Sequence, residues 1–105
     1  MSAAQFIPAA ETDLKESYEY YDARDHDLAL QFMMCVRQTV DAIEKAPLRL
    51  PIAAKDMRKA PVSKFPFAVW YVTDGDSVIV ACLHSKRDGR KIALERLRAL
   101  GPAPQ

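Results

Sequence analysis

The densest apolar pattern in the chain covers two stretches, residues 65–73 and 77–84, which are rich in aromatic and β-branched side chains. They are separated by Asp74-Gly75-Asp76, a sequence that tolerates the positive φ of tight hairpin turns, so the pattern predicts a β-hairpin. Side chains alternate between the two faces of a strand, and strict alternation gives two apolar faces. One face would hold Phe67, Val69, Tyr71, Val78, Val80 and Cys82, and the other Ala68, Trp70, Val72, Ile79, Ala81 and Leu83. Such a hairpin must be covered on both sides, by helices of this chain or by another chain.

Two consecutive stretches nearer the start show the spacing of amphipathic helices, with apolar residues three and four positions apart. The first is expected to begin at Pro8, because the first turn of a helix does not need the N–H that proline lacks, and to end near residue 22. The second is expected to follow almost at once, capped by Asp25 or Asp27, and to run to about Ala46. A connection this short predicts an antiparallel αα-hairpin.

A third amphipathic stretch follows the predicted β-hairpin. Asp88 can cap its start, and Gly101 followed by Pro102 is typical of a helix end. We expect residues 102–105 to form a flexible tail.

Short extended segments complete the pattern. Residues 5–7 predict a first strand, and residues 57–62 predict a strand that Pro61 ends or places at an edge, whereas residues 47–55 predict a loop. The element order is then β-α-α-β-β-β-α, with the last three strands paired as an antiparallel meander. The expected fold is α+β, a single domain over residues 1–101 in which the αα-hairpin packs on one face of a small antiparallel β-sheet.

Half of the 105 residues are apolar and 28% are charged, as in ordinary globular domains. The formal net charge of +1 hides a division between the two halves of the chain. Residues 1–47 carry four Lys and Arg against nine Asp and Glu, a balance of −5, and residues 48–105 carry eleven against five, a balance of +6. A basic half can bind a polyanion or an acidic partner while the acidic half stays in water, although charge segregation also occurs without function.

The sequence holds few signals of other protein classes. It begins without a basic and apolar leader and lacks an apolar run long enough to span a membrane, so a cytoplasmic location is expected. Cys35 and Cys82 stand in apolar patterns without motif spacing and are expected to be buried thiols. Nucleotide-binding loops, zinc spacings and nucleophile elbows are absent from the sequence, so we expect neither a metal nor a cofactor.

A group of basic residues flanks the predicted meander and is the main candidate for function. The start of one antiparallel strand lies beside the end of the next, so these residues are expected to meet at one end of the sheet. Arg can hold a phosphate or carboxylate with two hydrogen bonds, Lys acts as a point charge, and His84 can transfer a proton near neutral pH. The candidates for binding a target or a phosphate are Arg58, Lys59, Lys64, Lys86, Arg87 and Arg90. The alternative is a solvated sheet end in which His84 is a hydrogen-bonded structural residue.

Several short motifs occur in one order along nearly the whole chain: Phe6-x-Pro8-x-Ala10-x-x-Asp13-Leu14, Tyr20-Tyr21, Ala29-x-x-Phe32, Pro47, Arg58, Phe65-Pro66-Phe67-x-Val69-x-Tyr71 and His84-x-x-Arg87. In these the chain resembles the RelE/ParE superfamily of bacterial toxins from type II toxin–antitoxin modules, and especially its ParE branch. The resemblance implies an αα-hairpin on a small antiparallel sheet, and an antitoxin whose extended or helical segment covers apolar grooves of the toxin. The antitoxin contacts implied are Phe65, Phe67, Trp70 and Tyr71.

The superfamily divides by target, and both branches have candidate residues here. RelE-like members cut messenger RNA on the ribosome, which needs an acid or base and cations around one phosphate. For a metal-independent nuclease of this kind the residues would be His84, Arg58, Lys86 and Arg87. Residues 92–105, however, lack the Tyr or His that this branch carries near its C-terminus.

ParE-like members poison DNA gyrase by binding it, which needs a complementary surface and no catalytic acid or base. The resemblance therefore favours a gyrase-binding toxin that a cognate antitoxin neutralises. A non-toxic regulatory relative is the third alternative. The resemblance further implies that DNA is contacted only through the antitoxin.

Overall fold

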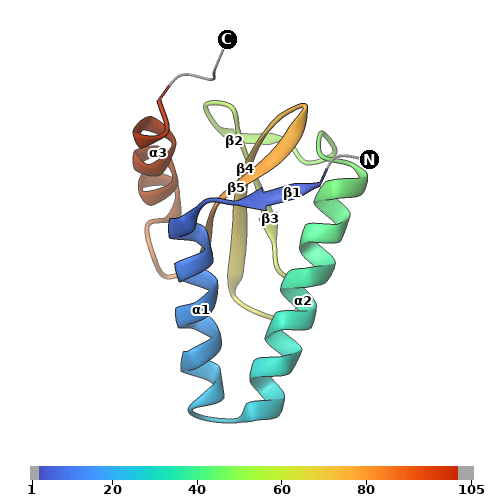
Figure 1. Ribbon diagram of the computed structural model, residues 1–105, viewed down its shortest axis with the longest axis vertical. Coiled ribbons are helices and arrows are strands. Elements are labelled where there is room, and N and C mark those ends of the chain that lie inside the picture. The colour runs from blue at the N-terminus through green and yellow to red at the C-terminus, as the bar shows by residue number, and fades with distance from the viewer. Residues whose placement is uncertain (1–2, 102–105) are drawn as a thin grey trace.

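The computed structural model describes residues 3–101 and contains three helices and five strands (Figure 1). In chain order these are β1 (Ala4–Phe6), α1 (Pro8–Asp22), α2 (His26–Lys45), β2 (Ile52–Ala54), β3 (Met57–Pro61), β4 (Phe67–Asp74), β5 (Asp76–His84) and α3 (Gly89–Ala99). The strands form one sheet in the order β1-β5-β4-β3-β2. The predicted α+β class, the αα-hairpin and the meander of β3, β4 and β5 are confirmed. The tail expected over residues 102–105 lies outside the described residues.

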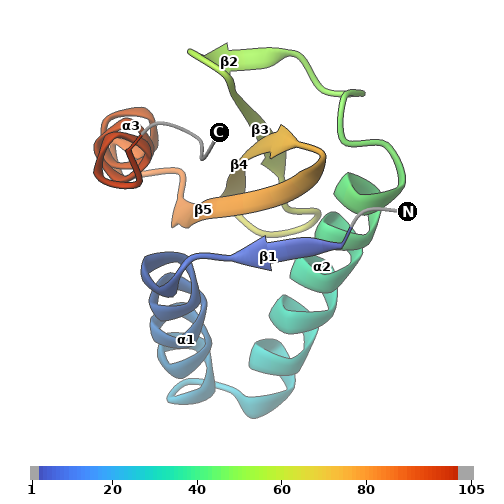
Figure 2. The same ribbon diagram turned by 45° about the horizontal axis from the view of Figure 1, so that its top comes forward.

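The two long helices begin where the sequence predicts. Pro8 occupies the first turn of α1. The carboxylate of Asp25 accepts hydrogen bonds from the backbone N–H groups of Asp27 (2.9 Å) and Leu28 (3.4 Å), which have no partner within α2. Figure 2 shows the α1–α2 pair on one side of the sheet and α3 standing apart from it, beside β5.

The sheet differs from the predicted antiparallel sheet in two ways. β1 lies at one edge and pairs with β5 in parallel, Ala4 beside Ser77 and Phe6 beside Ile79, so the sheet is mixed. The predicted element order also lacks one strand, because residues 52–54, expected to belong to a loop, form β2 and pair with β3. A strand of three residues is too short to show a recognisable alternation. It reaches β3 through a tight turn in which Lys55 has a positive φ of 50°.

A β-bulge in β5 overturns part of the predicted assignment of faces. The register shifts between Trp70 and Tyr71 of β4, so that Val80 is an extra residue on β5. Before the bulge the alternation is reversed: Ile79 faces the α1–α2 pair, whereas Val78 and Val80 pack on the opposite face. Strict alternation assigned these three residues the other way round, because a bulge leaves no mark in the periodicity of the sequence.

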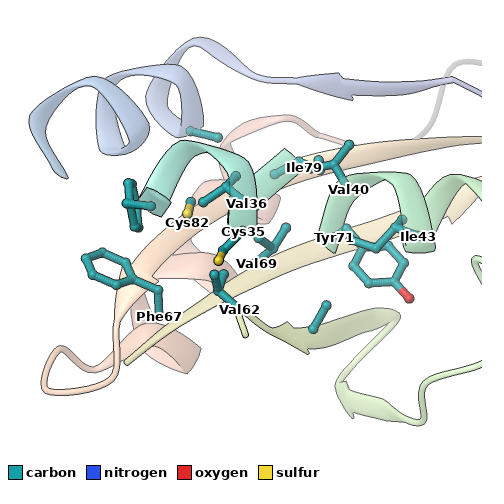
Figure 3. Close-up of a cluster of buried hydrophobic side chains, with 13 residues drawn as sticks. Cys35, Val36, Val40, Ile43, Val62, Phe67, Val69, Tyr71, Ile79 and Cys82 are labelled. Carbon is teal, nitrogen blue, oxygen red and sulfur yellow. The ribbon is translucent and has the colours of Figure 1, made fainter. Parts of the chain in front are cut away.

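Each face of the sheet has its own buried cluster, as the apolar hairpin requires. On the α1–α2 face, side chains of α2 such as Val36 and Ile43 pack on Val69 and Tyr71 of β4 (Figure 3). On the opposite face, α3 lies against β5 and buries Ala93 completely. The predicted cover on both sides is therefore supplied by helices of this chain.

Both cysteines are buried free thiols, as predicted. Across residues 3–101 no helix is long and apolar enough to cross a membrane. Within the same range, no three His, Cys, Asp or Glu side chains are grouped so that they could hold a metal ion.

Candidate target-binding surface

Most of the predicted basic residues gather at the end of the sheet where β4 begins and β5 ends. Phe67 pairs with His84 at this end. The N–H of Ser85 donates to the carbonyl of Pro66 (2.7 Å), which ties the β3–β4 loop to the β5–α3 loop. Three basic residues lie in these two loops, and all are exposed: Lys64, Lys86 and Arg87.

His84 is half-buried and held in one orientation. Its Nδ1 accepts a hydrogen bond from the backbone N–H of Lys86 (3.0 Å), and its ring packs edge-on to Phe67 with the ring centroids 5.1 Å apart. With Nδ1 occupied as an acceptor, we assign the proton of the neutral ring to Nε2. These contacts agree with the structural role weighed for His84, and they leave Nε2 as its remaining polar atom.

A pocket of about 280 Å³ lies between the β3–β4 loop, the end of β5 and the start of α3. Lys59, His84 and Arg87 line it together with Trp70. Lys59 lies opposite Trp70 in the β3–β4 register, and its Nζ is 5.4 Å from the centre of the indole ring, a cation–π distance. Antiparallel pairing thus brings basic residues from β3 and from the end of β5 to one pocket.

Arg58 does not join this group, contrary to the expected meeting of all the basic residues. In the β3–β4 register it lies opposite Tyr71, three positions from the strand end that borders the pocket. Its Nη1 donates to the carbonyl oxygens of Leu48 (3.5 Å) and Leu50, and the hydroxyl of Tyr71 donates to the carbonyl of Pro47 (2.8 Å). Burial raises the pKa of Tyr71, and the nearby Arg58 charge opposes that rise. Arg58 and Tyr71 therefore fasten the loop of residues 46–51 to the sheet.

The four aromatic residues implied as antitoxin contacts lie mostly inside the domain. Tyr71 is fully buried, and Phe67 and Trp70 expose 8% and 5% of their surface. Phe65 is half-buried and packs edge-on against Phe32 of α2, with the ring centroids 5.3 Å apart. Where both faces of a strand are apolar, the pattern does not distinguish core aromatics from those that face a partner. Of the four, Phe65, Phe67 and Trp70 line the pocket described above, whereas Tyr71 does not.

A buried ion pair that sequence reasoning missed joins α1, β5 and α3. Arg96 binds Asp13 with two hydrogen bonds, Nη1 to Oδ2 (2.5 Å) and Nη2 to Oδ1 (2.9 Å). The N–H of Cys82 donates to Asp13 Oδ2 (3.0 Å), and Arg96 Nη1 also donates to the carbonyl of Val80 (3.1 Å). β1 pairs with β5 only as far as Ile79, so these two side chains satisfy backbone groups of β5 beyond the end of β1.

The ion pair shifts the pKa of Arg96 and contributes to the shifted pKa of the neighbouring Cys82. The hydrogen bonds that Arg96 donates to Asp13 raise the pKa of Arg96 against the opposing effect of burial. Burial, and secondarily the charge of Asp13, raise the pKa of the Cys82 thiol to about 12. The sequence contained one signal of this pair: Asp13 stands on the apolar stripe of the first helix, three positions after Ala10 and next to Leu14. A carboxylate buried at such a position requires a partner.

A family model described as "ParE toxin of type II toxin-antitoxin system, parDE" matches residues 5–89, from β1 to the start of α3. The chain belongs to the ParE toxin family. The range of the ParE match contains Lys59, Trp70, His84 and Arg87, whereas Arg96 lies outside it. The recognition of a ParE-like type II toxin from its motifs is therefore confirmed.

The fold of this ParE-family chain is similar to a solved structure described as "Chromosomal ParDE TA system from P. aeruginosa". The TM-score is 0.70 at 17% sequence identity, and the match covers 80% of this chain and 96% of the other. At this level of identity the likeness shows a shared fold. No curated protein matches the chain.

Proposed function

We propose that this ParE-family toxin acts in the cytoplasm by binding and poisoning DNA gyrase, and that a cognate antitoxin neutralises it. The surface proposed to meet gyrase is the basic sheet end, defined as Lys59, Lys64, Lys86 and Arg87 together with Arg90 in the first turn of α3. All five side chains are exposed, and none takes part in the ion pairs formed within residues 3–101. Unpaired surface charge of one sign increases the rate and specificity of association with an oppositely charged surface.

The position of Arg58 is the observation that favours binding over RNA cleavage. A metal-independent ribonuclease needs an acid, a base and cations around one phosphate. Of the four residues considered for that role, Arg58 is held away from the basic sheet end by the loop carbonyls of Leu48 and Leu50. Nδ1 of His84 is also occupied, by the N–H of Lys86. A binding surface needs charge and a complementary shape alone, and the exposed side chains of the basic sheet end supply the charge.

The antitoxin is proposed to cover a groove on the other side of the molecule. This groove, of about 610 Å³, lies between β1 and α2 and is lined by Phe6, Leu14, Met33 and Met34. Met34 exposes 62% of its surface, and β1 is an edge strand of the sheet. An extended or helical antitoxin segment would bury these apolar side chains, and the antitoxin would carry any contact with DNA.

A supercoiling assay with purified gyrase, run beside a primer-extension assay for ribosome-dependent messenger cleavage, tests the function. We expect inhibited supercoiling or trapped cleaved DNA, intact message, and relief by the antitoxin. Cleaved message with unaffected gyrase would establish the nuclease alternative. A folded chain that changes neither reaction would establish the non-toxic relative.

Single substitutions sharpen this test. Arg87→Gln is expected to weaken gyrase inhibition roughly tenfold, because a charged contact is lost. Lys45→Gln removes an exposed charge at the end of α2 and is the matched control, which should inhibit like the natural chain. His84→Gln should retain most of the inhibition, whereas a nuclease that uses His84 as acid or base would lose about two to four orders of magnitude in rate.

A further inference from the structure

Trp70 holds a hydrogen-bond donor that the fold does not use. Only 5% of the surface of this residue is exposed. Yet none of the side-chain hydrogen bonds formed within residues 3–101 involves its Nε1–H. The buried side-chain polar atoms without a partner in this range are Arg58 Nε and Ser77 Oγ, so Nε1 of Trp70 is not among the atoms closed off from solvent. Trp70 lines the pocket at the basic sheet end, so the acceptor can come from outside the chain.

The start of α3 brings the backbone unusually close to this donor. A Cβ placed on Gly89 would lie 2.9 Å from Trp70 Nε1, closer than side-chain carbons normally approach. Only glycine allows this approach without displacing the indole. The N-terminal end of α3, with its partial positive charge, therefore lies beside the indole N–H.

The remaining pocket wall combines apolar surface with positive charge. The ionisable residues that line it are Lys59, His84 and Arg87, so its chargeable groups are all basic. The other contributors are mainly apolar and include Phe65, Pro66, Phe67, Ala68 and Leu83. Such walls accommodate a methylene chain that ends in an anionic oxygen.

The geometry points to a docking pocket for a carboxylate side chain on an acidic, apolar segment of the toxin's protein target. One carboxylate oxygen would accept the Trp70 Nε1–H, and Lys59 and Arg87 would supply the charge. A nucleic-acid strand fits less well, because bases stack on open aromatic faces and the indole ring is buried beneath Lys59. This inference rests on the proposed function, since the pocket belongs to the surface assigned to the target.

The single tryptophan makes the inference directly measurable, because the chain gives one indole ¹H–¹⁵N signal. We expect N-acetyl-Leu-Glu-amide to move this signal downfield in a saturable way. The matched N-acetyl-Leu-Gln-amide should move it far less at the same concentration. An equal response to both peptides would overturn the inference, as would the lack of a saturable shift. A stronger response to inorganic phosphate than to the Glu peptide would also overturn it, in favour of a nucleic-acid phosphate.

Three variants test the residues involved. Lys59→Gln changes an exposed side chain and should weaken Glu-peptide binding roughly tenfold. Gly89→Ala sets a methyl group against Nε1 and should abolish the shift. Lys91→Gln removes an exposed charge that lies on α3 outside the pocket, and should bind like the natural chain. Unchanged peptide binding by Lys59→Gln and Gly89→Ala would overturn the inference.

Gyrase assays on the same variants distinguish the pocket from the function. Peptide binding by a chain that leaves gyrase unaffected would support the carboxylate pocket and overturn the proposed target. Full gyrase inhibition by Lys59→Gln and Gly89→Ala would support gyrase as the target and overturn the proposal that the pocket binds it.

Discussion

Two arginines near β5 show how one type of side chain can stabilise the fold or remain available to a partner. Arg96 on α3 has 20% of its side chain exposed and is bound to Asp13 by two hydrogen bonds. Arg87, in the loop that precedes α3, is exposed and takes no part in the ion pairs formed within residues 3–101. The charge of Arg96 is used within the domain, whereas that of Arg87 adds little to stability and is presented at the basic sheet end.

Arg58 and Lys59, which are neighbours on β3, differ in the same way. Arg58 donates to the loop carbonyls of Leu48 and Leu50, while Lys59 points to the pocket and lies over Trp70. Net charge does not reveal this division. The surface available to a partner is defined by which cations lack an internal acceptor.

The largest effect is expected from breaking the buried pair. Asp13→Ala leaves the N–H of Cys82 without its acceptor and leaves Arg96 with the carbonyl of Val80 alone, and should lower the free energy of unfolding by about 3–5 kcal/mol. Urea unfolding followed by circular dichroism measures this loss. The control is Asp41→Ala, which breaks an exposed pair with Arg37 and should cost less than about 1 kcal/mol. Similar losses in the two variants would contradict the inference that the pair of Asp13 and Arg96 stabilises the fold more than an exposed ion pair does.

An intermediate effect is expected from the neighbours on β3. Arg58→Gln should cost about 1.5–3 kcal/mol of unfolding free energy, because the loop of residues 46–51 loses its charged donor. Lys59→Gln should stay within about 0.5 kcal/mol. Gyrase inhibition, measured where both variants are folded, should show the reverse order. Weaker inhibition by Arg58→Gln than by Lys59→Gln would contradict this expectation and show that Arg58 belongs to the target-binding surface.

Features set by neighbouring residues were predictable from the sequence. Asp25 and Pro8 mark the helix starts because capping depends on residues within one turn, and the β4–β5 hairpin follows from its own turn and alternation. The parallel pairing of Phe6 with Ile79 joins residues far apart in the chain, and periodicity carries no information about it. The bulge at Val80 could not be predicted for a related reason, because a bulge is defined by the register between β5 and its partner strand β4.

The site was predictable to the extent that strand direction determines it. Antiparallel pairing correctly placed Lys59 near His84 at the end of β5 and near Arg87 in the loop that follows. Arg58 was misplaced because strand direction does not give the register or the acceptors offered by a distant loop. Asp13 signalled a buried partner, but nothing in its local sequence selects Arg96, 83 positions away, from the other basic residues.

The smallest effect is expected at an exposed pair between α1 and α2. His26 Nδ1 lies 2.6 Å from Asp22 Oδ1, and this hydrogen bond, followed by the charge of Asp22, raises the pKa of His26 above its ordinary value of 6.5. The folded protein therefore holds the proton more tightly than the unfolded chain. The resulting stabilisation is complete below the unfolded pKa of 6.5 and is lost as the pH rises through the folded pKa.

Asp22→Asn should lower the pKa of His26, as followed by an NMR titration of its imidazole signals. Stability should change little at any pH, because both side chains are exposed and screened by solvent. Asp27→Asn is the control, since Asp27 acts on His26 through charge alone and should move its pKa less. A larger change with Asp27→Asn would show that His26 responds to the acidic surroundings in general. The pKa of His26 would then depend on the surrounding charge and not on its hydrogen bond with Asp22, unlike the contact between Asp13 and Arg96, which depends on specific hydrogen bonds.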